Sequence, residues 1–198
     1  MINYSNTAPP ESVDIGGAVF SINTDYRIWI DISQKLLEFD LSDNSQEAND
    51  YNIQLMIDIF ITAFGEIPNC PYQDTLQAII NFLHGYPQIK GSSNQTTTQD
   101  GTKLYSFKHD LNYILIAIRN QSGLDLSYRC KHFHWWLFML EFQTLEDRHF
   151  VCQLMKRRAY NGKDPELIKL RESVALPKEL TRSEQRLSEE IDALFYNT

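Results

Sequence analysis

Two pairs of cysteine and histidine residues have spacings that could bind a metal ion. Cys130 and His134 are four residues apart and His149 and Cys152 are three apart, so each pair would share one face of a helix. If the two helices packed together, these side chains could form a Cys2His2 zinc site. Neither spacing matches a common zinc-finger signature. We therefore favour buried or surface side chains over zinc ligands, and we expect no metal or cofactor.

The same region could be drawn as a nucleophile with a neighbouring base, using Cys130, His132 and His134. A helical chain with five histidines offers such combinations without any catalytic meaning. The sequence contains no glycine-rich phosphate loop, no Gly-x-Ser-x-Gly turn and no His-Glu-x-x-His motif. We therefore predict that the protein is not an enzyme.

Lys156, Arg157 and Arg158 form the main basic cluster, at the end of a predicted helix. The negative end of the helix dipole favours cations at this position, which is the structural interpretation. Contact with nucleic acid is the functional interpretation. A sequence pI near 5.1 and the lack of a recognised binding module argue against it.

The net charge of -8 is distributed unevenly along the 198 residues. Residues 1–100 carry thirteen acidic and three basic side chains, a net charge of -10, whereas residues 101–198 carry thirteen acidic and fifteen basic ones, a net charge of +2. The acidic first half would repel a phosphate backbone. The asymmetry favours solubility or packing of the two halves, and association of the acidic half with the basic half of another copy is the alternative.

The sequence predicts a cytoplasmic protein. It contains no run of eighteen apolar residues, so no membrane-spanning helix is expected. Residues 1–10 lack the basic and apolar regions of a secretory signal. The cysteines are an odd set of three, Cys70, Cys130 and Cys152, which favours reduced thiols.

Hydrophobic periodicity predicts a mainly α fold, a compact domain of about seven helices with a small N-terminal β-hairpin. Gly16 and Gly17, between short β-branched stretches, predict the hairpin within residues 13–22. Apolar residues at helical spacing, with turn-forming residues at their ends, predict the helices. These helices span residues 25–38, 51–64, 72–84, 110–121, 127–141, 145–159 and 164–174.

Flexible segments and a final helix are expected to flank or interrupt this domain. We divide the chain into a flexible tail (1–12), a helical domain (13–178) and a C-terminal helix (179–198). Residues 91–101 contain no apolar side chain and predict a flexible loop within the domain. The final helix carries an apolar stripe that either packs on the core or binds a partner: Leu187, Ile191 and Leu194.

Residues 127–158 are expected to form a helical hairpin around the adjacent Trp135 and Trp136. Neighbouring residues on a helix point about a hundred degrees apart, so both indoles cannot lie at the centre of one packing face. The structural interpretation is that one indole fills the core while the other covers a helix junction. The functional interpretation is that one of them anchors a partner.

Five segments of the chain resemble a family of small tailed-bacteriophage proteins. They are I-N-T-D-Y-R-I-W-I at 22–30, Y-S-F-K-H-D-L-N-Y-I-L-I-A-I at 105–118, G-L-D-L at 123–126, F-H-W-W-L-F-M-L at 133–140 and K-L-R-E-S-V-A-L-P at 169–177. The resemblance extends from about Val19 to Pro177. Family members occur mostly in phages and prophages of Gram-positive bacteria, with genes usually between those of the major tail protein and the tape-measure protein. The loop at 91–101, the cysteines and His149 depart from the family pattern.

By gene position, the resemblance implies a non-enzymatic tail assembly chaperone in the cytoplasm of the infected bacterium. It would bind the tape-measure protein, with the major tail protein as another possible partner and a homo-oligomer left open. A structural component of the tail or connector in the virion is the alternative, and a nucleic-acid-binding regulator is the second alternative. A partner helix would lie in an exposed apolar groove. The candidate contact residues are Trp29, Trp135, Trp136 and Phe138, with the terminal stripe of Leu187, Ile191 and Leu194.

Overall fold

The computed structural model describes residues 8–39, 45–86, 103–127 and 130–177. Within these ranges the chain forms seven helices and a two-stranded antiparallel sheet, which confirms the predicted mainly α fold with its N-terminal hairpin. None of the described helices is both long and apolar enough to cross a membrane. The loop expected at 91–101, the helix expected at 179–198 and most of the tail expected at 1–12 lie outside the described residues.

The hairpin consists of β1 (Ser12–Ile15) and β2 (Ala18–Ser21), joined by two glycines as the sequence predicts. Gly16 and Gly17 have φ angles of 63° and 88°, in the left-handed region that the tight turn of a two-residue hairpin requires. The hairpin packs through β1 against α3 (Tyr72–His84). A two-stranded sheet needs such a support, because an isolated hairpin is only marginally stable in water.

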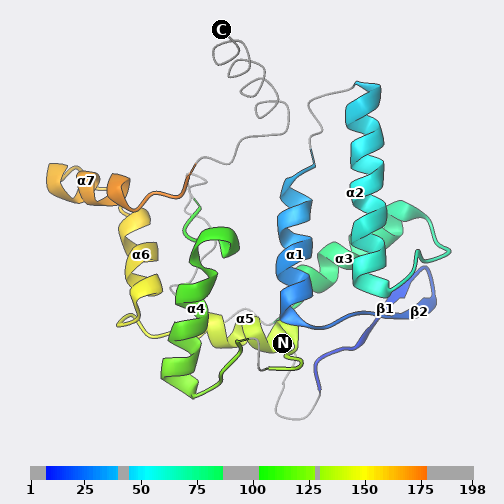
Figure 1. Cartoon of the computed structure of the whole chain (residues 1–198), viewed down its shortest axis with the longest axis horizontal. Coiled ribbons are helices and arrows are strands. Elements are labelled where there is room, and N and C mark those ends of the chain that lie inside the picture. The colour runs from blue at the N-terminus through cyan, green and yellow to red at the C-terminus, as the bar shows by residue number, and fades with distance from the viewer. Residues whose placement is uncertain (1–7, 40–44, 87–102, 128–129, 178–198) are drawn as a thin grey trace, which may run out of the picture.

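On one side of the molecule, α1 (Tyr26–Leu37) packs along α2 (Gln46–Phe64), and α2 contacts α3 (Figure 1). The predicted bounds of α3, residues 72–84, are confirmed. Helix α2 begins five residues before the predicted start at residue 51. The reason is a cap at Ser45, whose hydroxyl oxygen accepts a hydrogen bond from the Ala48 amide (3.1 Å).

The second half contributes α4 (Phe107–Ser122), α5 (Trp135–Gln143), α6 (Phe150–Arg158) and α7 (Pro165–Ser173). Helix α5 is central, because it contacts both α1 and α4. Helix α6 packs on α4, and α7 packs on α6 and projects from the end of the molecule (Figure 1). The predicted start of α7 is confirmed, with Asp164 as the N-cap and proline at the first position.

The helix predicted over residues 127–141 is wrong in its first half, because α5 begins only at Trp135. The residues before it are extended and lie against the start of α1. The Tyr26 amide donates to the Phe133 carbonyl (2.9 Å), and the Trp135 amide donates to the Thr24 carbonyl (2.7 Å). These tertiary hydrogen bonds take the place of the first turns of the expected helix.

The helix predicted over residues 145–159 also begins late, at Phe150. Gln121 of α4 organises the turn between α5 and α6. Its side-chain nitrogen donates to the Thr144 carbonyl (2.9 Å), and its side-chain oxygen accepts from the Glu146 amide (2.8 Å). Thr144 therefore ends α5 and does not open a new helix.

Candidate functional site

The two adjacent tryptophans, Trp135 and Trp136, are both buried. The indole nitrogen of Trp135 donates to the Leu83 carbonyl and that of Trp136 to the Phe82 carbonyl, each at 2.9 Å. These carbonyls belong to the last turn of α3, where helix carbonyls lack the usual amide partner four residues on, although the Phe82 carbonyl also accepts from the Gly85 amide (3.3 Å). The two indoles point in different directions and are still both buried, because they bracket the end of one helix.

The other two aromatic candidates, Trp29 and Phe138, are buried as well. Trp29 packs on Phe82 with ring centroids 4.5 Å apart, and Phe138 stacks on Tyr26 at 4.7 Å. The expected exposed groove lined by Trp29, Trp135, Trp136 and Phe138 is therefore wrong, because all four side chains form the core. Three further candidates lie outside the described residues: Leu187, Ile191 and Leu194.

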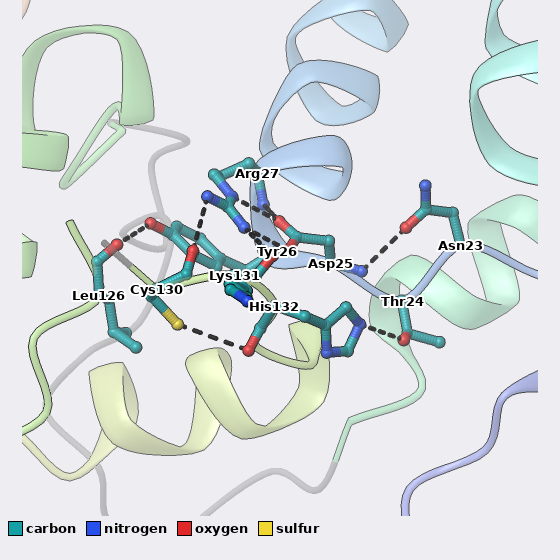
Figure 2. Close-up of polar contacts among 9 residues, drawn as sticks. All are labelled: Asn23, Thr24, Asp25, Tyr26, Arg27, Leu126, Cys130, Lys131 and His132. Atoms are coloured by element: carbon teal, nitrogen blue, oxygen red, sulfur yellow. Dashed lines mark hydrogen bonds and ion pairs between the residues drawn. The ribbon is translucent and has the colours of Figure 1, made fainter. Parts of the chain in front are cut away.

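Two of the segments that carry the family resemblance, residues 22–30 and 133–140, meet in space. Asp25 and His134 lie opposite each other in an antiparallel bridge, between the two backbone hydrogen bonds described above. The Thr24 hydroxyl also contacts Nε2 of His132 (3.0 Å; Figure 2). This contact attaches the start of α5 to the start of α1.

Arg27 reinforces this junction with its whole guanidinium (Figure 2). It donates twice to the Asp25 carboxylate (2.8 and 2.6 Å) and once each to the backbone carbonyls of Cys130 and Lys131 (3.0 Å each). Partial burial alone would raise the pKa of Asp25, but the hydrogen bonds from Arg27 hold it below its usual value. The Arg27–Asp25 pair is therefore ionised, and Arg27 positions the backbone of the segment before α5.

A third resemblance segment, residues 123–126, joins the same region. The Tyr26 hydroxyl donates to the Leu126 carbonyl at 2.5 Å (Figure 2). The segment at 105–118 supplies Asp110, which forms a buried ion pair with Arg158. The residues that mark the family thus bind each other, and their contacts define the fold.

The first pair of candidate zinc ligands, Cys130 and His134, does not share a helical face, because Cys130 precedes α5. The Cys130 thiol donates to the backbone carbonyl of His132 (3.4 Å). His134 caps α5, since its Nδ1 accepts from the Trp136 amide, and its Nε2 contacts the Pro10 carbonyl, both at 3.0 Å. Both ring nitrogens of His134 are therefore used by backbone groups.

The second pair, His149 and Cys152, has its own local partners. Nε2 of His149 contacts the side-chain oxygen of Gln121 (3.1 Å), and the buried thiol of Cys152 faces the Leu145 carbonyl. Burial raises the pKa of the Cys152 thiol, which opposes the thiolate that zinc needs. In the described ranges, no group of three or more His, Cys, Asp or Glu residues is arranged to hold a metal ion, so the zinc hypothesis is wrong.

A nucleophile–base pair is not formed by the residues that could have supplied it. The Cys130 thiol contacts a backbone oxygen, and the ring of His132 is engaged with the Thr24 hydroxyl. His134 binds two backbone groups, and burial lowers its pKa. The geometry therefore gives these side chains structural contacts in place of the acid–base chemistry that was considered.

The basic cluster at the end of α6 is divided among different roles. Arg158 is buried and paired with Asp110, whereas Lys156 forms an exposed ion pair with Asp147 (2.5 Å). Arg157 is half-buried. The hypothesis of a continuous phosphate-binding surface formed by Lys156, Arg157 and Arg158 is therefore wrong, because the Arg158 side chain faces the core.

An exposed apolar face lies where α4 packs against α6. It consists of Tyr113 and Ile116 of α4 and Phe150 of α6, which we term the α4–α6 face. Their exposed fractions are 44%, 47% and 50%. The rings of Tyr113 and Phe150 meet edge to face with centroids 5.0 Å apart, so the face is continuous across the two helices. Half-exposed aromatic side chains of this kind are typical anchors in protein interfaces.

The sequence contains part of the information that identifies these three residues, although none of them is among the predicted contact residues. Tyr113 and Ile116 are one turn apart and lie off the core stripe that contains Ile114 and Ile118. An apolar pair outside the core stripe is a recognisable sequence feature of an exposed apolar face. The position of Phe150 could not be derived, because the start of α6 was misplaced.

In the part of the chain that the structure describes, the protein is mainly helical. The segments that carry the family resemblance contact one another and contribute to its core. The chain belongs to the bacteriophage Gp15 protein family, whose model matches residues 6–178. It is therefore a bacteriophage protein, and membership supports a structural or morphogenesis role. Comparisons with curated proteins and with solved structures gave no significant match.

Proposed function

We propose that this phage protein is a tail assembly chaperone without enzymatic activity, acting in the host cytoplasm before the tail is complete. Its client would be the tape-measure protein, a long and helical chain with apolar stretches that need cover during assembly. The α4–α6 face carries the proposal, because two packed helices with exposed apolar side chains suit an apolar helix of a partner.

The expected strength of this contact fits reversible binding. Covering the exposed halves of Tyr113, Ile116 and Phe150 would contribute about 3 kcal/mol in total, at roughly 1 kcal/mol for each half-exposed side chain. Association costs more than this in lost translational and rotational freedom, so the face would act as one part of a larger contact. Weak individual contacts allow release when tail-tube subunits polymerise around the client.

The proposal is tested by co-expressing the chain with the tape-measure protein of the same phage. The wild-type chain is expected to raise the soluble yield of that protein and to copurify with it. Phe150→Asp should abolish both effects. Aspartate is compatible with folding at this position, because Phe150 is the first residue of α6 and a negative charge is favoured there.

Ile67→Asp is the matched control, since Ile67 lies in the loop between α2 and α3 and its exposed fraction of 54% is close to the 50% of Phe150. This variant should retain both effects. An unchanged soluble yield with the wild-type chain, together with no complex, would reject the chaperone proposal. Equal losses in the two variants would reject the α4–α6 face as its site.

A structural component of the tail is the alternative for the same family. Mass spectrometry of purified virions separates the two functions, because a chaperone leaves the finished particle and a structural component stays. The major tail protein is the second client to include in the copurification.

A further inference from the structure

The elements that form the α4–α6 face carry more positive than negative charge. Helix α4, helix α6 and the turn before α6 contain six basic residues: Lys108, Arg119, Arg148, Lys156, Arg157 and Arg158. They contain three acidic residues: Asp110, Glu146 and Asp147. Each acidic residue forms an ion pair with one of the basic ones, namely Asp110 with Arg158, Glu146 with Arg148 and Asp147 with Lys156. The net formal charge of these elements is therefore +3.

Three cations of these elements have no acidic partner among the described residues: Lys108, Arg119 and Arg157. The first two are exposed and the third is half-buried. Arg119 and Arg157 lie in the last turns of their helices, where the helix dipole favours cations. Lys108 is the second residue of α4, where the dipole disfavours a cation, so the dipole does not account for the whole set.

The three cations border the apolar side chains of the face. Lys108 and Arg119 are eleven residues apart, about three full turns, so they lie on one row of α4. Arg119 is one turn beyond Ile116 and therefore beside it. On α6, Arg157 follows Phe150 by seven residues, about two turns, and lies on the same side of the helix.

The cations also lie toward both ends of the face, because α4 and α6 are antiparallel. The Asp110–Arg158 pair joins the start of α4 to the end of α6. Gln121, near the end of α4, contacts His149 just before α6. An apolar segment lying on the face would therefore meet a cation at each end.

The first half of the molecule has the opposite charge. The described residues 8–39 and 45–86 carry ten acidic and two basic side chains, a net charge of -8. Helix α2 also exposes apolar side chains, Ile53 and Ile61, but all of its charged residues are acidic. An apolar helix with negative charge would be repelled there and attracted to the α4–α6 face.

We propose that the client segment bound by the α4–α6 face is an apolar helix flanked by carboxylates. This inference rests on the proposed function, since it takes the α4–α6 face as the client's site and adds the chemistry of the segment that fits. The apolar stripe would cover Tyr113, Ile116 and Phe150, and the carboxylates would lie against the three cations. Nucleic acid is a poorer match, because phosphates would pair with the cations and leave the apolar side chains uncovered.

The test uses the full-length chain and two fluorescent helical peptides that share one leucine stripe. The first peptide has glutamate beside the stripe, and the second has lysine at the same positions. In anisotropy titrations at low salt, the glutamate peptide should bind at least about tenfold more tightly than the lysine peptide. The difference should shrink as the salt concentration rises.

The double variant Lys108→Glu/Arg119→Gln should remove this preference. Both positions are exposed, and a carboxylate is favoured in the first turn of α4, so folding should persist. The variant should bind the glutamate peptide about tenfold more weakly and the lysine peptide more tightly. Lys169→Glu, at an exposed position of α7, is the control and should change neither affinity by more than about twofold. Phe150→Ala should weaken both peptides, because each covers the same apolar side chain.

Equal affinities of the two peptides for the wild type overturn the inference, and so does an unchanged preference in the double variant. Displacement of the glutamate peptide by duplex DNA would assign the cations to phosphate and also overturn it. If the tape-measure protein copurifies equally well with the wild type and the double variant, the carboxylate flanks are rejected and the chaperone function stands. A glutamate preference without any tape-measure complex supports the binding chemistry and rejects the chaperone function alone.

Discussion

Arg158 and Asp110 form a two-pronged ion pair in the core, with Nη1–Oδ2 and Nη2–Oδ1 distances of 2.6 and 3.1 Å. The same guanidinium also donates to the backbone carbonyls of Leu104 and Val174 (2.9 and 2.7 Å). It thus joins α6 to the start of α4 and to the segment after α7. The sequence places Arg158 in a basic surface cluster, whereas in the structure its guanidinium is buried and connects α6 to neighbouring segments.

Removing one partner of this pair should strongly destabilise the fold. Asp110→Asn or Arg158→Met leaves a buried charge without its counter-charge, and each change should lower the free energy of unfolding by about 3–5 kcal/mol. The double variant should lose less than the sum of the two single losses, because neither charge then remains unpaired. Urea unfolding, monitored by circular dichroism, measures the free energy of unfolding of the two single variants and of the double variant.

Lys156→Ala is the control for that experiment. The Lys156–Asp147 pair is exposed, so its removal should change the free energy of unfolding by less than about 1 kcal/mol. Comparable losses for the exposed and the buried pair would contradict the structural role assigned to Arg158.

Gly85→Ala should destabilise the junction between α3 and α5. A Cβ atom at Gly85 would lie 2.7 Å from Cζ2 of Trp136 and 2.7 Å from the Asn81 carbonyl oxygen. The backbone φ of −74° suits alanine, which in open space would stabilise the chain. The contact with the indole reverses the sign, and we expect a loss of about 1–3 kcal/mol. Thermal unfolding measures this loss, and Gln77→Ala, at an exposed position of the same helix, is the control. A stabilised Gly85→Ala variant would show that the indole can move aside.

The sequence predicts helices best where their ends are determined locally. The bounds of α3 and the start of α7 follow from turn residues and an aspartate–proline cap that act within a few residues. The start of α5 does not, because Thr24 and Tyr26, more than a hundred residues away, provide the hydrogen bonds that keep the preceding residues extended. Periodicity within one segment contains no information about such a partner.

The candidate site also shows which information is local in the sequence and which depends on tertiary packing. The sequence identifies Trp135 and Trp136 as important but does not reveal that both cap the end of α3, because that depends on tertiary packing. The exposed apolar residues could be found only after the core residues of each helix were known. Tyr113 gains its meaning from the contact with Phe150 across two helices.

His134 should make stability depend on pH in a defined window. Its Nδ1 accepts from the Trp136 amide, so the neutral ring carries its proton on Nε2, which donates to the Pro10 carbonyl. Burial holds the pKa of His134 below its unfolded value of 6.5. Below pH 6.5 the unfolded chain therefore binds a proton that the folded chain does not. Stability should be unaffected by His134 above this pH and should fall as the pH drops from 6.5 towards the lower folded pKa.

The variant His134→Asn isolates this effect. Asparagine keeps an N-cap acceptor for α5 but does not titrate. Denaturant midpoints measured from pH 8 to pH 5 should show a shallower loss for the variant than for the wild type. Parallel pH profiles would mean that another group is responsible for the acid sensitivity.

Arg27 should control access to Cys130. Its guanidinium holds the Cys130 and Lys131 carbonyls against the start of α1, and the Cys130 thiol is half-buried beside it. Arg27→Met removes these hydrogen bonds while keeping most of the aliphatic stem. Because the site is partly exposed, the loss should be modest, and labelling of Cys130 by a thiol reagent should accelerate roughly threefold to tenfold, the range set by one or two net hydrogen bonds. The measurement uses a Cys70→Ser background, since Cys152 is buried.

Arg27→Lys should accelerate labelling almost as much, because an ammonium cannot reach both carbonyls and the Asp25 carboxylate together. Unchanged labelling in both variants would show that the segment before α5 is held by its backbone hydrogen bonds to Thr24 and Tyr26 alone.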